Sequence, residues 1–363
     1  MRSSIKWPVI FALLTACVDP ITFKASGSDK YLVVEGLITD QPGPYSVTVS
    51  RSFPNDDTAY GIAAETGATV SLYVNDSFAE ELVETSPGVY QTSAVTGVVG
   101  NIYHILIQTS DGKTYTSEPE LLRPVGALTK IHAEFEARTI QTINGEADGD
   151  RFNIFVDGNI TDEPESYVRW RFNGTYLVRT NPELAFGFVE GNKIPLPYEC
   201  SGYRSDNFGP IVYSFPCTCC VCWVTEHDDR WFVGASEEVT SAGYKDVFVG
   251  QANVNRVTFQ EKYHVEIEQM SLSPKAYEFF RQLEAQAEGV ESLFQPATGA
   301  IKGNISAVNS DEQVLGLFYT SSSKTISMDL LRSDLPYKLQ PPDTSRRPCT
   351  GMRGSSNVKP PFW

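Results

Sequence analysis

Five cysteines crowd into residues 200–222, and their spacing could support a metal site, a redox pair or a set of disulfides. They are Cys200, Cys217, Cys219, Cys220 and Cys222, with Cys349 far downstream. Cys219 and Cys222 have C-x-x-C spacing. A zinc site would need a second ligand pair or clustered histidines, and a redox pair would need a βαβ context, but the sequence shows neither. We expect three structural disulfides of open connectivity, at least one of which ties the C-terminal tail to the cluster.

A seventh cysteine, Cys17, closes the run Leu14-Thr15-Ala16-Cys17, which is typical of a lipoprotein processing signal. Arg2 and Lys6 give a positive start, and the apolar stretch that follows is too short to span a bilayer. The pattern predicts a signal peptide over residues 1–16, lipidation of Cys17, and an anchored linker over residues 17–29. The alternative is a chance cysteine after an ordinary signal peptide.

Catalytic and cation-binding patterns are weak. His104, His132, His227 and His264 are scattered, and the chain has no nucleophile elbow, zinc-protease motif or phosphate-binding glycine loop. Residues 226–229 could form an acid-base or cation site, and residues 146–150 resemble part of a calcium loop, but solvated acidic turns explain both. We therefore predict no catalytic residue, no metal and no cofactor.

An aromatic-rich segment is the preferred interaction surface. Its ligand-binding or partner-binding candidates are Phe186, Phe188, Tyr198, Tyr203, Phe208 and Tyr213, with Phe215 just beyond them. Glycine and proline interrupt the segment, so regular strands cannot account for all of these rings, and stapling by disulfides would order them before any partner binds. The alternative is that the rings pack the loop onto its own sheet. The loop over residues 54–67 is a weaker second candidate.

Composition excludes one class of partner. The formal net charge of −16 and the pI of about 4.7 argue against nucleic acid, whose phosphates require clustered Lys and Arg. An aromatic content of 12% suits β-structure and ligand-facing surfaces. No second apolar run reaches the length of a transmembrane helix.

The elements that must position these residues are mainly strands. Short alternating segments over residues 31–39, 45–52, 68–74, 89–92, 103–109 and 114–117 are separated by turn residues, which predicts an immunoglobulin-like β-sandwich over residues 30–123. Residues 124–363 predict a second β-rich domain with an irregular stretch over residues 181–222 and an extended C-terminal strap. One prominent helix is expected, with Ser273 as N-cap, Pro274 as its first residue and Gly289 at its end.

Several ordered motifs run through the mature chain. They are residues 17–20, 32–36, 67–70, 88–90, 111–115, 217–223, 302–305, 314–318 and 359–363. In this order they resemble the DUF4249 family, with the cysteine-Trp cluster and the Phe-Trp ending as the most specific parts. The resemblance implies a lipoprotein of Bacteroidota encoded beside TonB-dependent receptors. The resemblance supplies no catalytic residues. Asp19 is the single acidic residue just after Cys17, too few acidic residues for a surface-export signal, so the face of the outer membrane that the chain occupies stays open.

Three functional hypotheses follow. The first is a non-enzymatic outer-membrane lipoprotein, anchored by its N-terminal lipid, that assists a TonB-dependent receptor or binds a peptide or glycan ligand for uptake. The second is an independent surface glycan-binding or adhesive module, which requires several coplanar, solvent-facing rings. The third is a hydrolase, which requires paired carboxylates converging in a cleft.

Overall fold

A computed structural model of the chain describes residues 31–52, 62–143, 145–205, 210–227, 232–235, 242–290, 301–342 and 344–363. The expected signal peptide, Cys17 and the anchored linker lie outside the described residues. The fold is mainly β with one α-helix, as predicted. Two β-structures and a disulfide-bonded extension make up the described chain.

The first β-structure is a sandwich of two sheets. One sheet contains β1 (Leu32–Thr39), β2 (Ser46–Ser52), β3 (Ile62–Ala64), β6 (Val83–Ser86), β7 (Val89–Gln91) and β25 (Val314–Ser321); the other contains β4 (Thr69–Val74), β5 (Ser77–Glu81), β8 (Ile102–Gln108), β9 (Thr114–Ser117), β10 (Glu120–Leu121) and β24 (Ile305–Ala307). Alternate residues of β1 and β8, such as Leu32, Val34, Ile105 and Ile107, point inward and are fully buried. The period-2 pattern in the sequence therefore reports the buried face correctly.

The sandwich is completed by strands from the far end of the chain. β25 pairs with β1 in parallel, and β24 pairs with β9. This differs from the expected boundary, which placed everything after residue 123 in the second domain. A Cβ on Gly36 would lie only 2.8 Å from Cδ2 of the Phe318 ring, which is too close. The close packing of β1 and β25 therefore depends on this glycine. Periodicity within each segment cannot report such a long-range pairing.

The second β-structure is larger and encloses its own core. One sheet contains β11 (Leu128–Glu136), β14 (Arg151–Gly158) and β22 (Tyr244–Asn253); the other contains β15 (Tyr167–Arg179), β20 (Val221–His227), β21 (Phe232–Ala235), β23 (Lys262–Leu272), β26 (Ser323–Leu331) and β27 (Ser355–Ser356). A short hairpin of β12 (Thr139–Thr142) and β13 (Gly145–Asp148) extends from it. Trp170, Tyr263 and Ile267 lie in the core between the sheets, where Trp170 Nε1 donates to Gln269 Oε1 at 3.0 Å.

The helix α1 (Pro274–Val290) lies between the two β-structures. Ser273 is its N-cap, because its Oγ accepts from the Ala276 N–H at 3.1 Å, as the sequence predicts. Phe280 packs with Leu317 of β25 and Met270 of β23. The chain then passes from β25 directly into β26, and the Asp40 carboxylate accepts from the Ser323 N–H at 2.9 Å at this junction. Strand continuity, helix and side chains therefore all join the two β-structures.

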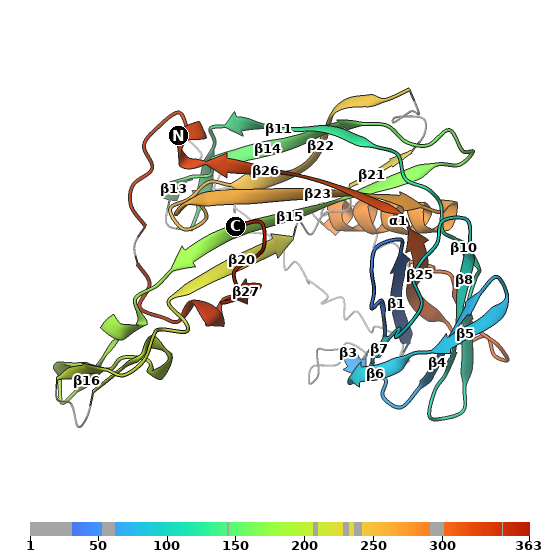
Figure 1. Cartoon of the computed structure of the whole chain (residues 1–363), viewed down its shortest axis with the longest axis horizontal. Helices are drawn as coiled ribbons and strands as arrows, with labels where there is room; N and C mark the ends of the chain where they lie inside the picture. Colours follow the sequence, from blue (N-terminus) through green and yellow to red (C-terminus); the bar gives the residue numbers. More distant parts are fainter. Residues whose placement is uncertain are drawn as a thin grey trace, which may run out of the picture.

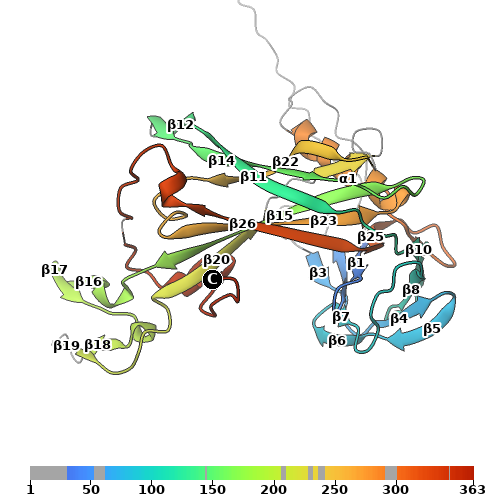
Figure 2. The same ribbon diagram turned by 45° about the horizontal axis from the view of Figure 1, so that its top comes forward.

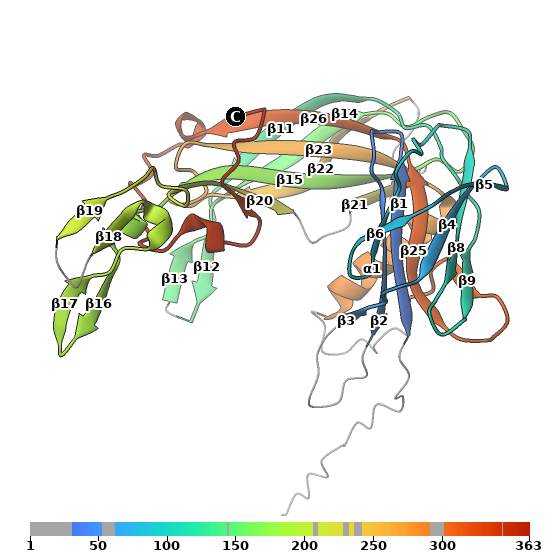
Figure 3. The same ribbon diagram turned by 60° about the horizontal axis from the view of Figure 1, so that its bottom comes forward.

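The long strands of the second β-structure form a span with a projection at each end. The first sandwich projects at one end and the disulfide-bonded hairpins at the other (Figure 1). Both projections lie on the same side of the span (Figure 3). The C-terminus lies near β20 and β26, midway along (Figure 2). Among the described helices, none is long and apolar enough to cross a membrane.

Candidate functional site

The segment expected to be irregular forms two hairpins, which we call the stapled module (residues 181–205 and 210–222). β16 (Phe186–Val189) pairs with β17 (Asn192–Pro195), and β18 (Tyr203–Ser205) pairs with β19 (Ile211–Tyr213). The 3₁₀ turn Pro182–Leu184 connects β15 to the first hairpin, and the 3₁₀ turn Glu199–Ser201 connects the two hairpins. Each hairpin is too short to be stable alone, so its order depends on the cross-links described next.

Three disulfides hold the stapled module. They are Cys200–Cys219, Cys217–Cys220 and Cys222–Cys349, with sequence separations of 19, 3 and 127. The last ties the C-terminal tail to the cluster, as expected. Cys219 and Cys222, the C-x-x-C pair considered from the sequence, bond to different partners and so form neither a metal-ligand pair nor a dithiol. The other pair at this spacing, Cys217 and Cys220, is joined as a disulfide. Gly202 has a φ of +79°, and a Cβ there would lie 1.7 Å from the Phe215 carbonyl oxygen, so only glycine fits this turn.

The predicted aromatic candidates divide into exposed and covered rings. Phe188, Tyr198 and Tyr213 are 69%, 42% and 58% exposed. Phe186 is partly buried between cations, with Lys193 Nζ 4.0 Å and the Arg346 guanidinium 4.9 Å from its ring centre. Tyr203 is partly buried and meets Tyr213 edge to face. Phe208 lies outside the described residues.

Together with aliphatic neighbours, the exposed rings give the stapled module an apolar surface. We call this the stapled surface; its residues are Leu184, Phe188, Val189, Leu196, Tyr198, Ile211, Val212, Tyr213 and Phe215, each at least 39% exposed. Exposed apolar side chains gathered on one small extension are typical of interaction surfaces, so we treat the stapled surface as the candidate site. Aromatic residues of this kind supply most of the energy at protein interfaces.

The C-terminal tail is an extended strap, as predicted, and its end covers a His-Asp pair. His264 Nδ1 lies 2.7 Å from Asp329 Oδ1, and the Phe362 ring stacks on the imidazole at 4.1 Å. Burial opposes ionisation of Asp329, but hydrogen bonds from Lys262 and His264 outweigh it and hold the pKa of this carboxyl below its usual range. No hydroxyl or thiol of a described residue hydrogen bonds to His264, so the pair has no nucleophile to activate.

The two acidic segments singled out in the sequence do not gather ligands in the described structure. His227 Nδ1 lies 2.6 Å from Asn173 Oδ1, and Asp228 and Asp229 lie outside the described residues. Asp150 accepts from the Arg138 N–H and from the Tyr337 hydroxyl. Its oxygens are therefore engaged in holding the β12–β13 hairpin and the tail.

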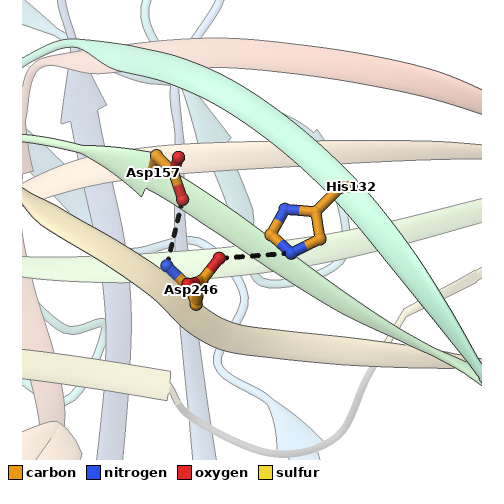
Figure 4. A group of neighbouring side chains, drawn as sticks. All are labelled: His132, Asp157 and Asp246. Atoms are coloured by element: carbon orange, nitrogen blue, oxygen red, sulfur yellow. Dashed lines mark hydrogen bonds and ion pairs between the residues drawn. The ribbon is translucent and has the colours of Figure 1, made fainter.

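A different group does bring potential metal ligands together. His132 of β11, Asp157 of β14 and Asp246 of β22 each offer one ligand atom, all within 4.8 Å of one another (Figure 4). His132 Nε2 lies 3.3 Å from Asp246 Oδ1, and the Asp246 N–H donates to Asp157 Oδ1 at 3.0 Å. One imidazole and two carboxylates suit a divalent transition metal. The three residues lie on separate strands without a spacing signal, so the sequence does not single them out.

Comparisons with known proteins give a family match and distant structural similarities. The model of a family described as "Domain of unknown function (DUF4249)" matches residues 18–327. No curated protein matches the chain. Among solved structures, the chain is similar to a crystal structure from Corynebacterium diphtheriae of a protein named as membrane anchored, at 9% identity and a TM-score of 0.18. The match covers 67% of this chain and 55% of that one, so the chain spans about half of its length.

Proposed function

Because the chain belongs to the DUF4249 family, we propose that it is a non-enzymatic outer-membrane lipoprotein that acts as an accessory or ligand-binding partner of a TonB-dependent uptake system. The observation that carries this proposal is the stapled surface. Lipid on Cys17 would attach the chain to the membrane, and the stapled surface would contact the receptor.

The arrangement of the chain supports this division of roles. The proposed anchor precedes β1, so it joins the first sandwich, whereas the stapled surface lies at the opposite end of the span (Figure 1). Residues 17–31 could extend about 50 Å from the lipid to β1. A partner in the same membrane could therefore meet the stapled surface while the sandwich stays tethered.

The disulfides make the stapled surface a favourable docking site. A loop that is already ordered loses little conformational entropy on binding, so more of its contact energy appears as affinity. Burying an exposed Phe or Tyr at an interface contributes about 25 cal/mol of favourable free energy per Å² of apolar surface removed from water. Phe188 and Tyr213 carry the largest exposed aromatic fractions of this surface. We therefore expect them to be its principal anchors.

The test is immunoprecipitation of the full chain from its native outer membrane in mild detergent, followed by mass spectrometry. Wild-type chain should bring down a TonB-dependent receptor in stoichiometric amount. The double variant Phe188→Ser, Tyr213→Ser should lose most of it. Phe78→Ser is the matched control, because Phe78 is a 59% exposed ring of β5 on the first sandwich. A wild-type chain that is recovered alone, or equal losses in both variants, would contradict receptor docking at this surface.

The glycan-binding alternative finds less support in the ring geometry. Stacking on a sugar needs rings that lie in one plane and face solvent, whereas Phe186 and Phe188 are inclined at 83° and Tyr203 and Tyr213 at 63°. A glycan array on the same purified chain distinguishes the two roles. Binding to a defined glycan that survives Phe188→Ser would place sugar recognition elsewhere in the chain.

A further inference from the structure

A cavity of about 790 Å³ lies between α1 and the outer face of the first sandwich. Its walls are largely apolar: Val33 and Leu37 come from β1, Leu317 from β25, and Phe279 and Leu283 from α1. The volume is within the range of small-molecule sites, roughly 300–1,000 Å³. α1 covers β25 through Phe280 and Leu317 but leaves the outer faces of β1 and β2 open, which creates this groove.

One partly buried cation lines the groove. Arg169 extends from β15, and its guanidinium lies 4.3 Å from the centre of the Phe280 ring. Its Nη1 lies 3.4 Å from the Tyr319 hydroxyl, and its Nε is buried without a hydrogen-bond partner. Among the described residues no carboxylate lies within ion-pair distance of it. Burial also lowers the pKa of this guanidinium.

The neighbouring arginine on the same strand is satisfied. Arg171, two residues along β15, points to the same face and pairs with Glu268 at 3.5 Å. Glu268 lies opposite Arg171 and two residues along β23 from Met270, the residue opposite Arg169, so it acts on Arg169 through space without pairing with it. A buried, unpaired charge destabilises a fold unless a partner compensates it. The ring of Phe280 compensates only part of this, because a cation–π contact is weaker than a charge-assisted hydrogen bond.

We propose that the groove binds an amphipathic carboxylate, a fatty acid or similar acyl carboxylate, with its head on Arg169 and its chain along the apolar wall. The carboxylate accepts charge-assisted hydrogen bonds from the part of the guanidinium that lines the groove. The hydrocarbon chain covers Val33, Leu37 and Leu283. Glu35 also lines the groove, and it is exposed to solvent, which screens its charge. This site is independent of receptor docking at the stapled surface.

The experiment uses the full chain in nanodiscs and a photoreactive fatty acid with a diazirine near its methyl end. After irradiation, peptide mapping should place the label on α1 or β1. Excess dodecanoate should compete, whereas dodecanol, which has the same chain without the charge, should compete at least about tenfold less well.

Two variants and one control separate binding from folding. Arg169→Met should reduce labelling about tenfold or more while leaving the ligand-free midpoint of thermal unfolding equal or higher, because an unpaired buried charge is removed. Leu283→Trp should reduce labelling by filling the groove while Arg169 is intact. Arg171→Met should label as wild type does. Labelling that is unaffected by Arg169→Met, equal competition by the alcohol, or a label mapped outside the groove would each overturn the proposal.

Discussion

Replacing Glu120 by Gln should stabilise the protein at alkaline pH. Glu120 of β10 is only 3% exposed, and one of its carboxylate oxygens has no hydrogen-bond partner. Burial is the dominant influence and raises the pKa of this carboxyl to about 7, although hydrogen bonds from Ser273 and Asn304 pull it down. These two partners lie at the start of α1 and beside β25, so the carboxyl sits where the first sandwich meets the rest of the chain.

The sign and size follow from the shift. Below pH 4.5 the carboxyl is protonated in both the folded and the unfolded state, so it contributes nothing to pH dependence. Between pH 4.5 and about 7 the folded state holds the proton more tightly, so stability falls as pH rises. Above about pH 7 the buried, ionised carboxylate destabilises the folded state by roughly 3 kcal/mol, because its pKa is raised from 4.5 to about 7. Gln cannot ionise and avoids this penalty.

The assay is urea unfolding of wild type and Glu120→Gln at pH 5, 6, 7 and 8. The difference in the free energy of unfolding should grow from about 1 kcal/mol at pH 5 to about 3 kcal/mol in favour of the variant at pH 8. Glu118→Gln is the matched control, because Glu118 is 55% exposed and pairs with Lys275 on the surface. Its effect should stay within about 0.5 kcal/mol at every pH. A Gln variant that is no more stable than wild type at pH 8 would refute the reasoning.

Three further outcomes test other parts of the structure. Joint replacement of Cys222 and Cys349 by Ser opens a 127-residue loop and should lower the free energy of unfolding by about 2–5 kcal/mol, measured by urea titration; a smaller change would mean that packing alone holds the tail. Gly202→Ala should leave free thiols in the stapled module, detectable by thiol titration, because a methyl group cannot enter this turn. If Zn²⁺ binds the group of His132, Asp157 and Asp246, a Zn²⁺ concentration of about 100 times its Kd should raise the free energy of unfolding by about 2.7 kcal/mol. Asp157→Asn should abolish that gain, and an unchanged gain would place the ion elsewhere.

The individual elements were largely predictable. Alternation predicted the strands around Leu32 and Ile105, and the N-cap Ser273 with Pro274 predicted where α1 begins. Cysteine number and position predicted a bridge to Cys349. These features depend on local spacing or on chain chemistry, which the sequence displays directly. Short strands without alternation, such as those of the stapled module, carry no such signal and were expected to be irregular.

The sites depended on contacts between distant segments. His132 and Asp157 meet because β11 and β14 pair side by side, and Asp246 joins them where the β14–β22 register is irregular. A shift of one residue would turn a side chain to the other face. The aromatic residues of the stapled module were identified from sequence, but which rings stay exposed depends on neighbours such as Arg346, far along the chain.

The sequence by itself therefore determined the class of fold, the helix, the cysteine chemistry and the acidic surface, because each depends on composition or short-range spacing. Tertiary structure alone decided that β25 completes the first sandwich and that Arg169 of β15 lies against α1 with no carboxylate of the described residues at ion-pair distance. The physical reason is that burial and charge compensation are set by everything that surrounds a side chain. In this chain those surroundings come from segments more than a hundred residues apart.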